Sequence, residues 1–148
     1  MSNTNNIFNL VHMIGQITNE NIVRFTNEFS YPIGISTIIV LREINNRGPV
    51  KHTDLAESLG YSKSSITKIA NKLVSLDLIQ RTYDKSDKRA VYLIITDKGI
   101  AALKESIALG DKIYNELYNI LTEDELSSYI EIQKKLLAKI SASKRLSP

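Results

Sequence analysis

The sequence predicts a mainly helical fold with one small β-hairpin, arranged as a winged helix-turn-helix between long N- and C-terminal dimerisation helices. Apolar residues recur at helical spacing in six segments, and two β-branched runs bracket a polar loop at residues 84–89. We expect one domain over residues 1–148. Within it, the winged region spans 32–97 and the dimerisation helices span 6–30 and 98–144.

The composition is that of an ordinary globular protein, with 43% hydrophobic and 24% charged residues. The chain has no cysteine, which excludes disulfides and thiolate metal sites. The N-terminus lacks the basic start and apolar run of a signal peptide, and no apolar run approaches the roughly 20 residues of a membrane span. We therefore expect a cytoplasmic protein.

Two helices are expected before the helix-turn-helix. The first, residues 7–29, ends before Pro32, because the residue preceding a proline is pushed away from helical angles. The second, residues 35–46, stops at the turn formed by Gly48 and Pro49. The polar segments 1–6 and 141–148 at the two ends are expected to lack regular structure.

The next two helices form the helix-turn-helix. The short helix 51–59 has a poor N-cap in Lys51, and a tight turn at Gly60 follows it. The helix 62–76 begins at Ser62, a good N-cap, and contains no acidic residue. Its apolar stripe obeys helical spacing and consists of Ile66, Ile69, Ala70, Leu73 and Val74.

The hairpin and the last two helices complete the predicted fold. Strands at 79–83 and 90–95 flank the polar loop, and a long helix runs from Thr96-Asp97 to Leu121. Thr122 and Glu125 have the spacing of a capping box, which starts the last helix.

The net charge of +3 lies entirely in the winged region. Residues 51–98 hold 9 Lys and Arg against 6 Asp and Glu, whereas the segments on either side balance at 3 against 3 and 7 against 7. Cationic charge on one module is typical of a surface that binds phosphate.

The polar face of the helix 62–76 suits the major groove of DNA. Serine hydroxyls and helix N-terminal N–H groups bind phosphate, lysine can address guanine, and Asn71 can pair with adenine. Any surface helix has a polar outer face, but the preceding turn and the following basic hairpin favour DNA. The candidate contacts are Ser62, Lys63, Ser64, Ser65, Thr67, Lys68, Asn71 and Lys72.

The hairpin loop supplies four further candidates. An arginine on a narrow ribbon can enter the minor groove, and a nearby carboxylate can hold its guanidinium in place. A solvated hairpin tip of mixed charge has the same composition, so the spacing alone leaves both interpretations open. The candidate wing residues are Lys85, Asp87, Lys88 and Arg89.

From Gly48 to Gly99 the chain resembles the MarR family of bacterial transcriptional regulators. The matching stretches are residues 54–60, 64–68 with Leu73, 78–81, 84–90 and 95–99. The resemblance implies a recognition helix at 62–76 and a wing at 79–95.

Residue roles also follow from the resemblance. It implies that Arg89 enters the minor groove and that Asp87 braces it. The chain departs from the common family pattern at Lys85, where proline is frequent, and at Lys88, where arginine is frequent. Lys51 replaces the usual Ser or Thr cap.

The resemblance further implies a dimer with interleaved terminal helices. The sequence favours this independently, because the terminal helices are too long to be covered by a winged helix of about fifty residues. A monomeric antiparallel bundle is the alternative. The expected interface residues are Ile7, Leu10, Ile14, Ile17, Tyr129, Leu136 and Ile140.

These observations predict a sequence-specific regulator that binds duplex DNA at a pseudo-palindromic operator as a homodimer, and we expect a repressor. The alternative is a winged-helix module that binds protein without sequence-specific DNA binding. No catalytic motif is present, so we expect no enzyme and no cofactor. Two histidines without cysteine also disfavour a metal site.

The resemblance also implies release from DNA by a small, often aromatic or phenolic, effector bound between the dimerisation helices and the winged region. His12, Met13 and Arg42 lie on helices that would line such a crevice. We assign none of them to it. His12 is expected to be a partly buried helix residue, and Arg42 a surface or ion-paired one.

Overall fold

The computed structural model describes residues 3–146. Six helices and one two-stranded antiparallel hairpin make up this part of the chain, as the sequence predicts. In chain order the elements are α1 (Asn3–Glu28), α2 (Ile35–Arg47), α3 (His52–Leu59), α4 (Lys63–Ser75), β1 (Ile79–Tyr83), β2 (Val91–Ile95), α5 (Asp97–Tyr118) and α6 (Glu123–Leu146).

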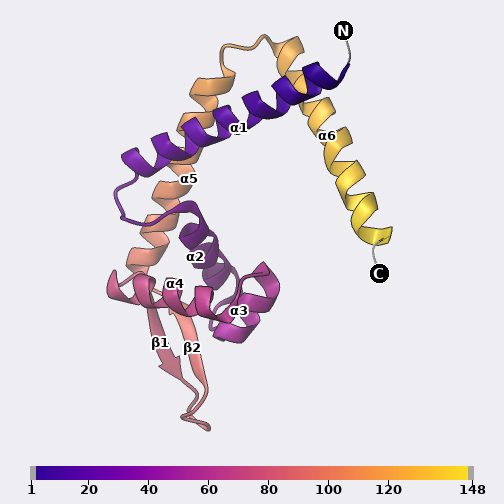
Figure 1. Ribbon diagram of the computed structural model, residues 1–148. Helices are drawn as coiled ribbons and strands as arrows, with labels where there is room; N and C mark the ends of the chain where they lie inside the picture. The colour runs from indigo at the N-terminus through magenta and orange to yellow at the C-terminus, as the bar shows by residue number, and fades with distance from the viewer. Residues whose placement is uncertain (1–2, 147–148) are drawn as a thin grey trace. The chain divides into compact units, whose positions relative to one another are not determined.

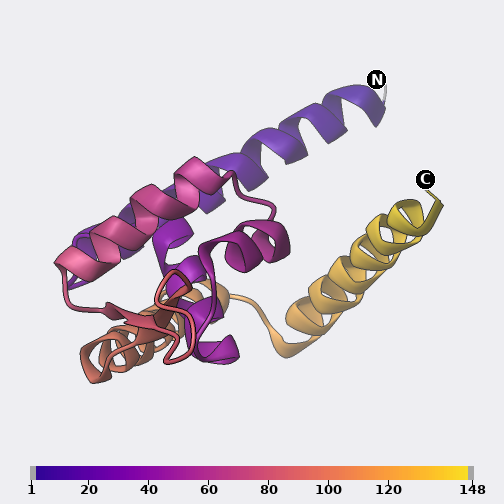
Figure 2. The same ribbon diagram turned by 90° about the horizontal axis from the view of Figure 1, so that it is seen from below.

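The chain divides into two compact units, Met1–Asp111 and Lys112–Pro148. The first unit contains the winged helix-turn-helix, and Figure 1 shows its hairpin projecting away from the helices, with the turn farthest from α2. Figure 2 shows α3 beside the end of α4 at the turn that joins them. No helix within residues 3–146 is long and apolar enough to span a membrane.

The core of the first unit lies between α2, α3, α4 and the hairpin. The apolar stripe of α4 supplies Ile66, Ala70 and Leu73, all fully buried. Each large aliphatic side chain contributes about 1.5–3 kcal/mol when it is fully buried. Other fully buried side chains of the first unit include Val40, Leu41, Ile44, Leu55, Leu78, Ile79 and Leu93.

Backbone conformation fixes the two turns on either side of α4. Gly60 ends α3 in the left-handed conformation, with φ of 68°, which glycine adopts at little cost. After α4, Asp77 also has a positive φ of 59°, and the backbone N–H of Leu78 bonds to the carbonyl of Leu73 at 3.0 Å. These two turns set the orientation of α4 relative to α3 and to β1.

The hairpin pairs Ile79 with Ile95 at its root and Tyr83 with Val91 at its end. Val50, before α3, pairs with Leu93 through two backbone hydrogen bonds of 2.8 and 3.1 Å. The middle of β2 is therefore attached to the segment that leads into α3.

The start of α5 lies tightly against the turn after α4. A Cβ on Gly99 would lie 2.1 Å from the carbonyl oxygen of Leu78, so no larger residue fits there without a shift. Thr96 caps the helix, because its hydroxyl oxygen accepts from the N–H of Gly99 at 3.0 Å. The same hydroxyl donates to the carbonyl of Asp77 at 2.6 Å.

The second unit contains the end of α5 and all of α6. The capping box is confirmed: the N–H of Thr122 donates to the Glu125 carboxylate at 3.0 Å, and the N–H of Glu125 donates to the Thr122 hydroxyl at 3.2 Å. Tyr118 stacks on Tyr114 with ring centroids 6.1 Å apart and meets Tyr129 at 5.9 Å.

Some expected boundaries are wrong. Residues 3–6 and 141–146 are helical, since neither segment contains a glycine or proline that would stop a helix. The expectation for residues 1–2 and 147–148 lies outside the described part of the chain. The fifth helix stops at Tyr118 rather than Leu121, and the third begins at His52 after Lys51, which gives no side-chain cap.

Candidate nucleic-acid interface

The N-terminus of α4 is organised by its serines. The Ser62 hydroxyl oxygen accepts a hydrogen bond from the backbone N–H of Ser65 at 3.1 Å, which confirms Ser62 as the N-cap. The Ser62 hydroxyl also donates to the Ser65 hydroxyl at 2.8 Å and lies 3.2 Å from that of Ser64. Three hydroxyls therefore gather at the positive end of the helix dipole, where an anion is favoured.

All eight candidate residues on this helix and its cap are exposed. Successive turns of α4 present Ser64, Lys68 and Lys72 to solvent, while the opposite side of the helix is buried against the core. No acidic residue lies between Ser62 and Leu76. The exposed face therefore combines hydroxyl groups and ammonium groups with no carboxylate, a chemistry that suits a polyanion.

Besides these serines, Thr67 and Asn71 use part of their hydrogen-bonding capacity inside the protein. The Thr67 hydroxyl donates to the carbonyl of Lys63 at 3.0 Å. The Asn71 side-chain carbonyl accepts from the guanidinium of Arg81 on β1. Pairing of Asn71 with adenine needs both the carbonyl and the amide of the side chain, so its carbonyl would have to leave Arg81 first.

The wing loop is ordered by its two aspartates. The Asp84 carboxylate accepts from the N–H of Ser86 at 3.0 Å and from its hydroxyl at 2.9 Å. These donors, the backbone N–H first, lower the pKa of Asp84. The loop therefore has a defined turn around Lys85.

Asp87 and Arg89 are next to each other at the tip of the wing. The Asp87 carboxylate accepts from the backbone N–H of Arg89 at 3.0 Å, and the carbonyl of Asp87 accepts from Ala90 at 3.1 Å. The guanidinium of Arg89 lies 3.9 Å from the same carboxylate, a loose ion pair, and the side chain is 98% exposed. Lys85 and Lys88 are exposed beside it.

Arg81 is a residue to which the sequence analysis gave no role. The alternation of side chains along the strand could have indicated that Arg81 faces the helices. Arg81 shares a face of the sheet with buried Ile79 and is paired with buried Leu93. Its guanidinium lies near His52, whose pKa is lowered mainly by partial burial and then by the charge of Arg81.

The other residues considered for ligands and metals are scattered. His12, expected to be partly buried, is exposed on α1, and Met13 and Arg42 are exposed as well. Within residues 3–146, no three His, Asp or Glu side chains are grouped as a metal site would require. The described part of the chain therefore gives the hydroxyl and cationic surface of α4 and the wing as the candidate site.

Comparison with known proteins matches the winged region to a family. The model of the MarR family matches residues 35–91. The uncharacterised transcriptional regulator YpoP of Bacillus subtilis is 31% identical over 97 residues, which are 66% of this chain and 69% of that protein. The chain belongs to the MarR family. It is a DNA-binding transcriptional regulator of that family, and the family is not one of enzymes.

Two further similar proteins have informative names. The transcriptional repressor MdtR of Bacillus subtilis is 30% identical over 67% of this chain, and the match spans just under two thirds, 64%, of MdtR. A mutant MarR of Escherichia coli, solved in complex with operator DNA, is 26% identical with a TM-score of 0.65, over 93% of this chain and 99% of that one.

Proposed function

We propose that this MarR-family protein is a repressor that binds a pseudo-palindromic duplex operator as a homodimer. The observation that carries the proposal is the exposed face of α4, where hydroxyls and lysines lie without any carboxylate beside a wing that ends in Arg89. The names of two relatives support it, since MdtR is called a repressor and the MarR mutant was solved with operator DNA.

The proposed division of labour follows from groove chemistry. The serines at the N-terminus of α4 bind phosphate, and Lys68 and Lys72 project towards base edges and phosphates in the major groove. Arg89 reaches into the minor groove, where negative potential is concentrated. Because the target is chromosomal DNA, the proposed location is the cytoplasm.

The dimer is proposed from apolar surface that the single chain leaves exposed. Ile14 and Ile17 on α1 are about half exposed, at 52% and 49%. The described residues of α6 include none that is buried. Large apolar surface left exposed on a helix marks an interaction site, and a second copy of the chain is the proposed partner of each helix. The seven expected interface residues are all exposed: Ile7, Leu10, Ile14, Ile17, Tyr129, Leu136 and Ile140.

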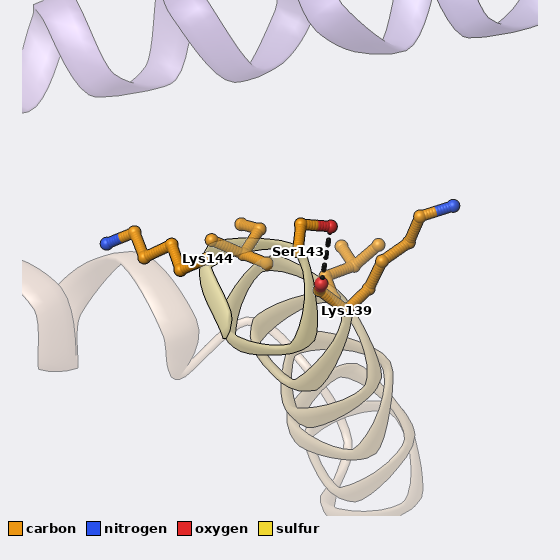
Figure 3. Close-up of a pocket in the computed structure, with 5 residues that line it drawn as sticks. Lys139, Ser143 and Lys144 are labelled. Carbon is orange, nitrogen blue, oxygen red and sulfur yellow. Dashed lines mark hydrogen bonds between the residues drawn. The ribbon is translucent and has the colours of Figure 1, made fainter. Parts of the chain in front are cut away.

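The C-terminal half of α6 illustrates this surface. Leu136 and Ile140 belong to an open groove of about 490 Å³ whose other lining residues are polar or charged. In Figure 3 the side chains of Lys139 and Lys144 extend to opposite sides of the helix, with Ser143 between them bonded to the carbonyl of Lys139 at 3.0 Å. An apolar strip with charged margins is the pattern of a helix that packs against another helix.

A salt titration tests the central proposal. The wild-type protein should bind a duplex selected by it from a random-sequence pool, with affinity that falls steeply as salt rises, because phosphate binding releases counterions. The selected sequences should contain two half-sites about 10 base pairs apart, related by two-fold symmetry. Weak binding without salt dependence would favour the alternative, a winged-helix module that binds protein.

We also propose that a small molecule regulates DNA binding, and we identify it only by its chemical class. A small aromatic or phenolic compound is expected from the family resemblance, and it would lower operator affinity when bound. A panel of simple phenols and benzoates, added to the protein–duplex complex, tests this directly. Compounds that leave the affinity unchanged at saturating concentration would remove this class of effector.

A further inference from the structure

Arg81 of β1 and Asn71 of α4 join the wing to the recognition helix. The guanidinium of Arg81 donates a hydrogen bond to the side-chain carbonyl oxygen of Asn71. Within residues 3–146, this is the one side-chain hydrogen bond between α4 and the two strands. The remaining connection between them is the short turn through Asp77 and the packing of apolar groups at the root of the hairpin.

The direction of Arg81 is set by the pleat of the strand. Successive side chains of a strand point to opposite faces, and Arg81 lies on the face of Ile79, which is buried. Gln80 and Thr82 lie on the other face. The guanidinium is therefore held on the side of the sheet that packs against the helices, near both Asn71 and His52.

We propose that the Arg81–Asn71 pair is a positioning device that fixes the angle between the recognition helix and the wing. This inference rests on the proposed function, in which α4 and the wing engage neighbouring grooves of the same duplex. When one DNA-binding element is bound, a second element held rigidly beside it meets its own groove at a higher effective concentration than one joined by a flexible hinge. The pair therefore raises operator affinity without touching DNA.

The geometry of the hairpin amplifies small movements at its root. A strand rises roughly 3.3 Å per residue, which puts the wing tip on the order of 10–20 Å beyond Arg81. A rotation of about 10° at the root then displaces the tip by about 2–3 Å, close to the length of a hydrogen bond. Loss of the pair is expected to affect Arg89 most, because Arg89 lies at the tip.

A direct role in DNA contact makes different predictions from a positioning role. If Arg81 bound phosphate and Asn71 bound a base, the losses on removing each would add. Removing Arg81 would also reduce the salt slope by about one unit. If the two residues act on each other, removing either should have the same effect as removing both. In a positioning role, each single variant and the double variant should also have a more mobile wing in the absence of DNA.

The first measurement is made on the free protein. The chain contains no cysteine, so Lys85→Cys gives a single site on the exposed wing for a spin label. The label's rotational mobility should rise in Asn71→Ala, in Arg81→Ala and in the double variant alike. Gln80→Ala, on the opposite face of the same strand, is the matched control and should leave the mobility unchanged. Unchanged mobility in Asn71→Ala overturns the proposal.

The second measurement uses unlabelled protein and the duplex selected by the wild type. Asn71→Ala, Arg81→Ala and the double variant should each lose about three- to tenfold in affinity, without additivity. Asn71→Asp keeps an acceptor for Arg81, so it should retain the wild-type label mobility. Additive losses overturn the positioning role. A wild type that selects no duplex contradicts the proposed function, and the label mobility still decides whether the pair holds the wing.

Discussion

The Ser62 hydroxyl oxygen lies 3.1 Å from the backbone nitrogen of Ser65 and accepts its hydrogen. This bond satisfies one of the N–H groups that the first turn of α4 leaves without a helical partner. It also places the hydroxyls of Ser62, Ser64 and Ser65 together at the end of the helix proposed to meet DNA phosphate.

Removal of this cap should destabilise the protein. Ser62→Ala should lower the free energy of unfolding by about 1 kcal/mol, because the N–H of Ser65 loses its acceptor. Urea unfolding followed by circular dichroism measures the change. Ser64→Ala, which leaves the bond from Ser65 to Ser62 in place, serves as control and should stay within about 0.5 kcal/mol of the wild type.

Lys68 should carry affinity for DNA. Lys68→Ala should weaken binding to the selected duplex by about 1–3 kcal/mol if the ammonium contacts a base edge. A phosphate contact would instead give a similar loss on all sequences and a salt slope lower by about one unit. Titrations on selected and random duplexes at several salt concentrations separate the two. Lys104→Ala, an exposed lysine on α5, should change neither affinity.

Arg89 should act on DNA without supporting the fold. Its side chain is 98% exposed, so Arg89→Ala should reduce duplex affinity and leave the melting temperature unchanged. Asp87→Ala should lose less affinity, since it removes an orienting carboxylate and at the same time a negative charge near phosphate. A large fall in the melting temperature of Arg89→Ala would show that the residue is structural.

Leu136 tests the dimer. The side chain is 53% exposed in the single chain, so Leu136→Glu should cost little in a lone chain. In a dimer that covers this position, an unpaired carboxylate would be buried at a cost of several kcal/mol. We expect loss of association by sedimentation at low micromolar concentration, together with loss of operator binding.

Ala138→Glu is the matched control for the dimer test. Ala138 lies two residues along α6 from Leu136, about 200° around the helix, and is exposed. It should remain associated. A wild-type protein that sediments at the 16.7 kDa of one chain and still protects a palindrome would contradict the proposed dimer.

His52 gives a prediction that depends on pH. Its pKa lies below 6.5 because of partial burial and then because of the positive charge of Arg81. The native protein therefore binds fewer protons than the unfolded chain, and the stability contributed by neutral His52 is lost as the pH falls below about 6.5. In Arg81→Gln the His52 pKa should rise towards 6.5, measured by NMR titration. If the His52 pKa does not rise in this variant, the charge of Arg81 does not act on His52.

The helices of this fold could be predicted from the sequence because their signals are local. Ser62 and Thr122 stand at the start of α4 and α6 with the right partners three residues later, and both caps form as expected. Gly60 ends α3 for an equally local reason, the cost of a left-handed conformation to other residues.

Features that depend on distant residues could not be predicted in the same way. The bond from Arg81 to Asn71 requires the packing of β1 against α4, which no single segment encodes. The exposure of His12 has a similar origin, since apolar spacing along α1 predicts an apolar face but does not say what covers it. The ends of α1 and α6 extend further than expected because polar residues without glycine or proline permit a helix without favouring it.

The close approach of Gly99 to Leu78 has a mechanical consequence. A Cβ on Gly99 would lie only 2.1 Å from the carbonyl oxygen of Leu78, and the Thr96 hydroxyl donates to the carbonyl of Asp77 at 2.6 Å. The first turn of α5 therefore packs directly against the segment that joins α4 to β1. A displacement of this turn of α5 would therefore act first on Leu78, the residue just before β1. Through this contact, the position of the N-terminus of α5 is coupled to the orientation of the hairpin at its root.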